Sequence, residues 1–398
     1  MASKLDVALT CARGVGVDVW DVLSGAHLKT VPIPTASGAV ALLGPHSHLF
    51  LCPDADKPSM QLWSWRHGHN RFRSAIAEKI EVLAVSHDQQ MCVGGARSGR
   101  LYIWDLVSGD LLRTWDAHYK AISALTFTPD DAYIVSGGED AIINLWSVFD
   151  IFAGRAIGSQ SASSSAVNTE DSVQAARSWS DHALAVTQLW CSSGPSAGRL
   201  FSSSLDRTCK IWDIPSGTLL HSLSFASQIH TITVEPAERF LYAGAADGTV
   251  YQVDLINGVS TGAASSSAAF GTAGAAATSI ASSSNGPLQP LVFSGHTKAI
   301  TSLSLSYDGS RLLTGSMDGT ARIWDTRSRQ SIKVLSKQRI AYTAVSFVTD
   351  FDGAFGDDQA QKRVRFRVLI VVCFLCCAYQ LLIHGASRLY LCRRRSPR

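Results

Sequence analysis

Short runs of apolar residues, separated by turn sequences, recur along most of the chain. In the clearest group, "AITSLSLS" alternates apolar and polar residues, and "RLLTGS" and "GTARIWD" carry denser apolar runs. Alternation predicts half-buried β-strands, and denser runs predict strands that are covered on both faces. The sequences "YDGS" and "MDGT" between these runs are typical of tight turns. With "QSIKVLS" as the last member, the pattern predicts a group of four short strands.

The third strand of each group ends in a position that is nearly always Trp. This position is occupied by Trp20, Trp63, Trp104, Trp146, Trp212, Val253 and Trp324. The steps between them are 43, 41, 42, 66, 41 and 71 residues. Four of these steps are close to the ~40–45 residues of a four-stranded propeller blade. The pattern therefore predicts seven repeats, with extra chain in two of them.

The extra chain has a different composition from the repeats. Residues 155–178 are rich in Ser, Ala and Gln, and residues 257–288 contain "STGAASSSAAFGTAGAAATSIASSSNG". Neither stretch carries enough apolar bulk to offset the entropy lost on ordering. We expect two disordered insertions, both between the third and fourth strands of their blades.

The two ends of the repeat region complement each other. The chain starts with "DVALTCARGVGVDVWD", which predicts the second and third strands of a blade without its first strand. The segment "AYTAVSFVTD" at 341–350 predicts an isolated first strand. Pairing of the two would close a ring and remove an exposed sheet edge. The predicted fold is an all-β, seven-bladed propeller over residues 1–350, with one blade shared by the N- and C-terminal strands.

Charge is distributed unevenly along the chain. The formal net charge is +3, from 35 Lys and Arg and 32 Asp and Glu. Nine of the basic residues fall between Lys362 and Arg398, and no acid follows Asp358. The predicted propeller is therefore mildly acidic, which favours protein partners over bare RNA and leaves direct RNA contact open. The nine cysteines show no disulfide pattern and no secretory signal opens the chain, so we expect a reducing compartment.

Three repeats share a further set of polar residues at nearly fixed spacing. A His lies 28 to 30 residues before the Trp, an Asp six before it, and a hydroxyl four before that Asp. The three sets are His118, Ser136, Asp140 and Trp146; His182, Ser202, Asp206 and Trp212; and His296, Thr314, Asp318 and Trp324. Linked by hydrogen bonds, these groups would satisfy one another inside a blade.

These are the positions of the His, Ser or Thr, Asp and Trp residues of WD-repeat β-propellers, which the chain resembles. The resemblance implies a structural relay in each of the three blades. A catalytic Ser-His-Asp triad is disfavoured, because the trio occurs three times and no "GxSxG" turn is present. We expect no enzymatic activity, no cofactor, no metal site and no small-molecule substrate.

A narrower resemblance lies in "SLDRTCKIWD" followed by a blade without Trp, "PAERFLYAGAADGTVYQVDL". With "GGEDAIINLWSVFDIF" and "GVDVWDVLSGAHLKTV", these segments resemble the WD-repeat subunit of the Rix complex, the pre-rRNA-processing Ipi family. The resemblance covers residues 5–348. It implies a nuclear, nucleolar or nucleoplasmic scaffold in processing of the second internal transcribed spacer and maturation of the large ribosomal subunit. The implied partners are other Rix-complex subunits and pre-60S proteins.

The C-terminal segment departs from that family, which continues into a polar, partly coiled-coil helix. Here residues 351–367 are expected to form a linker and residues 384–398 a basic tail. Between them, Val368–Ile383 reads "VLIVVCFLCCAYQLLI". As a helix these sixteen residues would be about 24 Å long, whereas a helix that spans a bilayer needs ~20 residues.

Three interpretations of this apolar segment stay open. The first is a membrane anchor, with Cys373, Cys376, Cys377 and Cys392 as candidate acylation sites. The second is a helix packed on the propeller or on a partner. The third is a divergent C-terminus, for example translated intron. Membrane contact is expected only through this segment. Two alternative functions also stay open: an unrelated WD-repeat adaptor in ubiquitin ligation or trafficking, and a membrane-tethered propeller.

Overall fold

A computed structural model describes the fold of the repeat region. The described residues are 5–12, 14–33, 39–43, 48–68, 70–153, 173–192, 198–256, 277–279, 291–336 and 341–350. They all belong to one compact unit, Ser3–Phe351. The predicted linker, the apolar segment Val368–Ile383 and the basic tail lie outside the described residues. Among the residues that are described, no helix is long and apolar enough to cross a membrane.

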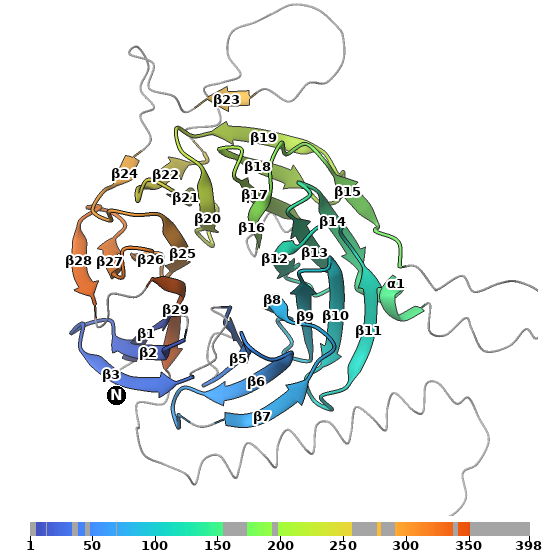
Figure 1. The fold of residues 1–398 in the computed structure, drawn as a ribbon. Coiled ribbons are helices and arrows are strands. Elements are labelled where there is room, and N and C mark those ends of the chain that lie inside the picture. The colour runs from blue at the N-terminus through green and yellow to red at the C-terminus, as the bar shows by residue number, and fades with distance from the viewer. Residues whose placement is uncertain are drawn as a thin grey trace, which may run out of the picture. The chain divides into compact units, whose positions relative to one another are not determined.

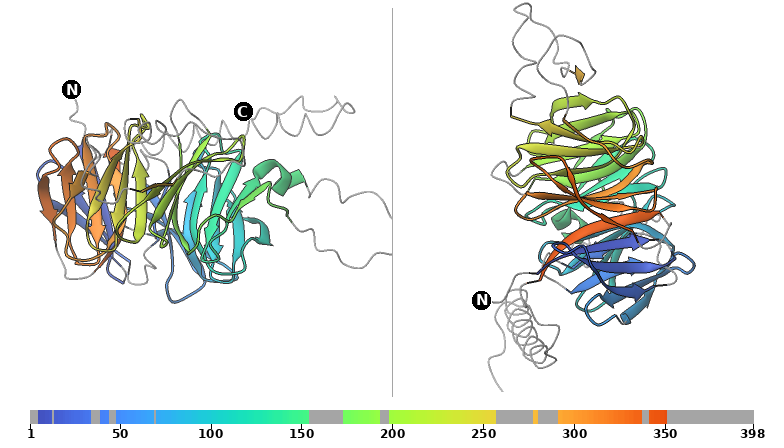
Figure 2. Two further views of the ribbon diagram at one scale, coloured as in Figure 1. Left: turned by 90° about the horizontal axis from the view of Figure 1, so that it is seen from above. Right: turned by 90° about the vertical axis from the view of Figure 1, so that its left-hand side faces the viewer.

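Seven β-sheets, each built on four antiparallel strands, stand side by side around a common centre (Figure 1). We number these sheets as blades in chain order. The predicted seven-bladed, all-β propeller is therefore confirmed, and a single short helix is present in the described part, α1 (Val148–Ala153). Seen from the side, α1 projects from the outer rim of the ring beside blade 4 (Figure 2).

Each blade runs from an inner strand, near the centre, to an outer strand. Blade 1 contains β29 (Tyr342–Asp350), β1 (Leu5–Ala12), β2 (Gly16–Asp21) and β3 (His27–Pro32). Blade 2 contains β4 (Ala41–Leu42), β5 (Leu49–Pro53), β6 (Ser59–Ser64) and β7 (Asn70–Ala75). Blade 3 contains β8 (Ile80–Val85), β9 (Met91–Ala96), β10 (Arg100–Asp105) and β11 (Leu111–Asp116). Blade 4 contains β12 (Ile122–Phe127), β13 (Tyr133–Gly138), β14 (Ile143–Ser147) and β15 (Arg177–Trp179).

The remaining blades follow the same order. Blade 5 contains β16 (Val186–Cys191), β17 (Arg199–Ser204), β18 (Thr208–Asp213) and β19 (Leu219–Ser224). Blade 6 contains β20 (Ile229–Val234), β21 (Phe240–Ala245), β22 (Val250–Asp254) and β24 (Leu291–Phe293). Blade 7 contains β25 (Ile300–Leu305), β26 (Arg311–Ser316), β27 (Ala321–Asp325) and β28 (Ser331–Leu335).

The ring is closed by the pairing of the two terminal strands. β1 and β29 are antiparallel, with Val7 opposite Val348 and Thr10 opposite Val345. Blade 7 holds the same strand from its other side, because Ser302 Oγ accepts a hydrogen bond from the Val345 amide at 3.1 Å. The predicted closure of the first blade is therefore confirmed.

Apolar side chains fill the space between neighbouring blades. Between blades 7 and 1, for example, Leu313 and Ile323 pack with Ala8 and Trp20. Glycine on the second strand lets the next inner strand approach closely. A Cβ atom on Gly315 would lie 2.8 Å from Val345 Cγ1, too close for van der Waals contact. The spacing of the blades is thus set by the packing of buried side chains and by the small size of this glycine.

The structure corrects the extent of both predicted insertions. The first was predicted to run to Ser178, but β15 begins at Arg177 and pairs with β14. Trp179 is buried there against Trp212 of blade 5, and Val173 and Ala175, just before the strand, pack against a buried apolar cluster. In the second, residues 277–279 form a short strand, β23, parallel to β19. This strand needs only backbone pairing, so its apolar content did not predict it.

Candidate functional site

The four predicted relay residues of blade 4 lie within hydrogen-bond distance of one another. The Trp146 indole can only donate, so Ser136 Oγ accepts its Nε1–H at 2.9 Å. The Ser136 hydroxyl then donates to His118 Nε2 at 2.8 Å. His118 Nδ1–H in turn donates to the Asp140 carboxylate at 3.1 Å. This order of donors places the ring proton of His118 on Nδ1 and leaves Nε2 as an acceptor.

Blade 5 repeats the arrangement with nearly the same distances. The Trp212 indole donates to Ser202 Oγ at 2.9 Å, and the Ser202 hydroxyl lies 2.8 Å from His182 Nε2. His182 Nδ1 lies 2.9 Å from Asp206. Both the hydroxyl and the imidazole are buried.

Blade 7 uses Thr in place of Ser. Trp324 donates to Thr314 Oγ1 at 2.9 Å, and Thr314 lies 2.7 Å from His296 Nε2. His296 Nδ1 lies 2.9 Å from Asp318. The structure therefore brings together all twelve residues of the three predicted sets.

The electrostatics favour a charged aspartate in all three relays and a neutral histidine in the relay of blade 7. Burial alone would raise the pKa of Asp318, but hydrogen bonds from Thr320 and His296 outweigh it and lower the pKa to about 2. Hydrogen bonds from the relay histidines likewise hold the pKa of Asp140 and Asp206 below the usual range, against burial. Burial lowers the pKa of His296 below its ordinary 6.5, despite the opposing effect of Asp318.

The relay hydroxyls are poorly placed for nucleophilic catalysis. Ser136, Ser202 and Thr314 are each 0% exposed. Each accepts from an indole and is bonded to an imidazole, so none faces a space where a substrate could bind. Within the described residues, no group of three or more His, Cys, Asp or Glu side chains is arranged to hold a metal ion. In each of the three blades, the hydrogen-bonding groups of the relay are partnered by one another inside the blade.

Each relay aspartate also fixes a backbone amide at the surface. Asp140 accepts from the Tyr119 amide at 3.2 Å, Asp206 from Ala183 at 3.1 Å and Asp318 from Thr297 at 3.2 Å. These amides follow the relay histidines directly, in loops that lead into the inner strands. Tyr119 is 94% exposed. The buried relays therefore bond to loops on one side of the ring. We call this side, which carries Tyr119, Ala183 and Thr297, the loop face.

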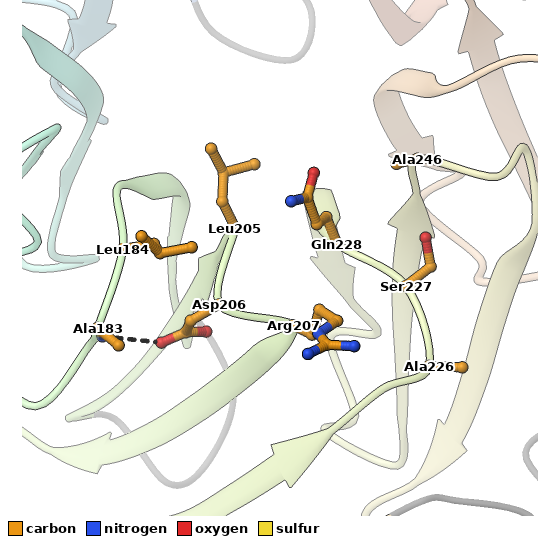
Figure 3. Close-up of a pocket in the computed structure, with 9 residues that line it drawn as sticks. All are labelled: Ala183, Leu184, Leu205, Asp206, Arg207, Ala226, Ser227, Gln228 and Ala246. Atoms are coloured by element: carbon orange, nitrogen blue, oxygen red, sulfur yellow. Dashed lines mark hydrogen bonds between the residues drawn. The ribbon is translucent and has the colours of Figure 1, made fainter.

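A cavity of about 530 Å³ opens on the loop face between blades 5 and 6 (Figure 3). Its lining includes Leu184, Leu205, Arg207 and Gln228. Figure 3 shows Asp206 bonded to Ala183 at its edge. The relay of blade 5 thus supports one wall of this cavity, which combines apolar walls with an exposed cation.

One polar pair was missed by the sequence reasoning. In blade 1, the Trp20 indole donates to Thr10 Oγ1 at 2.9 Å, although this blade has no histidine at the relay position. Thr10 and Trp20 are ten residues apart, the same separation as in the three complete relays. That spacing is the signal that would have predicted the pair.

Comparisons with known proteins agree with this geometry. The family model "WD domain, G-beta repeat" matches residues 109–147, 174–213 and 287–325, which are the three repeats with complete relays. WD repeat-containing protein 18 of Homo sapiens is 30% identical over 341 residues, covering 84% of this chain and 71% of the human protein. Protein ROOT INITIATION DEFECTIVE 3 of Arabidopsis thaliana is 28% identical over 336 residues, covering 83% and 68%. Pre-rRNA-processing protein IPI3 of Yarrowia lipolytica is 30% identical over 293 residues, covering 73% and 62%.

Proposed function

We propose a function for this chain from its family: it belongs to the WD-repeat family that includes WD repeat-containing protein 18 and pre-rRNA-processing protein IPI3. The proposed function is that of a scaffold in ribosome biogenesis. The specific role we propose is that of the WD-repeat subunit of a Rix-type complex. In that role it supports processing of the second internal transcribed spacer and maturation of the large ribosomal subunit. Its place of action is the nucleus, including the nucleolus.

The similarity to pre-rRNA-processing proteins across the propeller is the observation that carries this proposal. It covers most of the ring rather than one repeat, so it extends beyond what propellers share in general. The geometry is consistent with a scaffold, because the relays are buried and serve to hold loops at the surface. The partners are other Rix-type subunits and pre-60S proteins, held by protein contacts.

Affinity purification of the tagged full chain from its own cells tests the proposal. The expected result is recovery of large-subunit assembly factors and of pre-rRNA that retains the second internal transcribed spacer. A tagged propeller from an unrelated pathway serves as the control. Recovery of a cullin adaptor or vesicle-coat proteins, without assembly factors, would overturn the proposal.

A further inference from the structure

Outer strands of several blades carry a cation that reaches the next blade. This cation lies on the outer strand, opposite the third-strand residue that immediately precedes the repeated Trp of the blade. In blade 1 it is Lys29, opposite Val19, and in blade 4 it is Arg177, opposite Leu145. Lys29 Nζ donates to the Arg66 carbonyl of blade 2 at 3.0 Å. Arg177 Nη2 donates to a carbonyl of blade 5 at 2.6 Å.

Two more blades use the same position in the same way. In blade 3 it is Arg113, whose Nη1 donates to the Ile151 carbonyl of α1, beside blade 4. In blade 7 it is Lys333, whose aliphatic stem lies against Gly25 of blade 1. The position is Phe72 in blade 2 and His221 in blade 5. A cation here covers the outer part of the boundary between two blades.

Blade 6 has an apolar residue at this position. Leu291 lies opposite Gln252, and its side chain is 42% exposed. Phe293, two residues on, packs edge-to-face on Trp324 of blade 7 at 5.7 Å. Because residues two apart on a strand share a face, Leu291 also points toward blade 7.

The facing strand of blade 7 is exposed and apolar as well. Val334 lies opposite Arg322, whose guanidinium lies over the Trp324 ring at 5.8 Å. This face of blade 7 therefore points toward blade 6. Ile332 and Val334 are 47% and 52% exposed. Leu291, Ile332 and Val334 together form what we call the outer apolar strip.

The backbone beside this strip is open to pairing. β28 is the last strand of its sheet, so its outer edge pairs with no other strand in the described part of the chain. Such an edge presents free N–H and C=O groups that bind an added strand. Blade 5 shows that an outer edge of this ring accepts a fifth strand, because β23 pairs with β19.

Basic side chains predominate on β28 and in the turn before it. Lys333 lies on the strand, and Arg327 and Arg329 lie in the turn before it. The acid that precedes this turn, Asp325 at the end of β27, accepts a hydrogen bond from the Ser328 hydroxyl at 2.7 Å. No acid occurs in β24 or β28. Negatively charged side chains on a segment that pairs with β28 would therefore favour its binding.

We propose that β28 is a docking edge for an extended, acidic segment of a partner protein whose residues alternate between apolar and acidic. Alternate side chains of an added strand face opposite sides of the sheet. Its apolar residues cover the outer apolar strip on the blade 6 side, and its acidic residues lie beside Lys333 on the other side. Backbone pairing supplies affinity, and the alternation supplies register and specificity. The inference rests on the proposed scaffold function only in assigning a protein as the partner.

Binding of a fluorescein-labelled peptide of alternating Val and Glu to the purified full chain tests this edge. Fluorescence anisotropy is expected to show saturable binding, and Ile332→Lys or Val334→Lys is expected to weaken it about tenfold. Leu28→Lys is the matched control, because Leu28 precedes Lys29 on β3 as Ile332 precedes Lys333 on β28. It is expected to leave binding unchanged. Unaltered thermal melting of each variant shows that the fold is retained.

Two further probes separate the alternatives. The same peptide with methylated backbone nitrogens should not bind, because it cannot complete the strand pairing. Absence of binding by the unmodified peptide up to about 1 mM would overturn the proposal. So would equal binding by the methylated peptide, no loss in either Lys variant, or preferential binding of a single-stranded RNA oligonucleotide at the same residues. No ribosomal factor is present in this assay, so its failure leaves the proposed function to its own test.

Discussion

Ala8, near the start of the chain, lies opposite Phe347 in the antiparallel pairing of β1 with β29. The sequence separation of these two residues is almost the length of the propeller. Their pairing means that blade 1 cannot form until both ends of the repeat region are present. The stability of the whole ring therefore depends on a contact between its ends.

Truncation immediately before Tyr342 should open the ring. Loss of β29 exposes the edge of β1 and uncovers the faces of blades 1 and 7 that bury Ala8 and Leu313. We expect the melting temperature to fall by about 10 °C or more, or cooperative melting to be lost. Differential scanning calorimetry makes the measurement. A chain that ends at Asp350 is the control, and we expect it to melt as the full propeller does; equal stability of both truncations would contradict the closure.

Removal of a relay hydroxyl should destabilise its blade. Ser136→Ala leaves the Trp146 indole and the His118 imidazole without their shared partner in a buried site. The expected loss in the free energy of unfolding is about 1–3 kcal/mol, measured by urea titration. Ser227→Ala, at the rim of the loop-face cavity, should change it by less than about 0.5 kcal/mol. Similar effects of the two substitutions would contradict the structural role proposed for the relay.

The relay of blade 7 should make stability fall in acid. The pKa of Asp318 is about 2 in the folded protein, below its ordinary 3.8. The stabilisation is therefore complete above pH 3.8 and is lost as pH falls toward 2. His296, whose folded pKa lies below 6.5, acts in the same direction from pH 6.5 downward, because only the unfolded chain takes up its proton there. Urea titrations at several pH values should show a shallower acid loss for Asp318→Asn; an unchanged slope would count against this assignment.

The second insertion should be dispensable for folding. Deletion of residues 261–285 removes β23, which adds only three paired residues to the outer edge of blade 5. The four strands β16 to β19 keep their own pairing and their buried contacts. We expect the melting temperature to change by no more than about 2 °C. A large drop would show that blade 5 depends on the added strand.

The repeat made most of the fold predictable. Seven positions such as Trp146 recur along the chain, four of the six steps between them at blade spacing, and hydroxyl, His and Asp recur at nearly fixed distances from three of them. Features without such repetition were harder to predict. β15 depends on contact between Trp179 and Trp212, and α1 on packing of Ile151, neither of which leaves a periodic signal.

The outer apolar strip shows the limit most clearly. Leu291 is about one repeat away from Ile332 and Val334 along the chain. Only the strand register shows that they lie on the facing sides of blades 6 and 7. The bridging role of Lys29 and Arg177 is equally invisible without that register. Sequence patterns predict which residues face a core, whereas contacts between blades require the assembled ring.

The most direct test of the account is the amount of pre-rRNA that retains the second internal transcribed spacer after depletion of the protein. This precursor is expected to accumulate on depletion, to return to normal with the intact chain and to stay high with the chain truncated before Tyr342. An unchanged precursor level after depletion, or full rescue by the truncated chain, would contradict it.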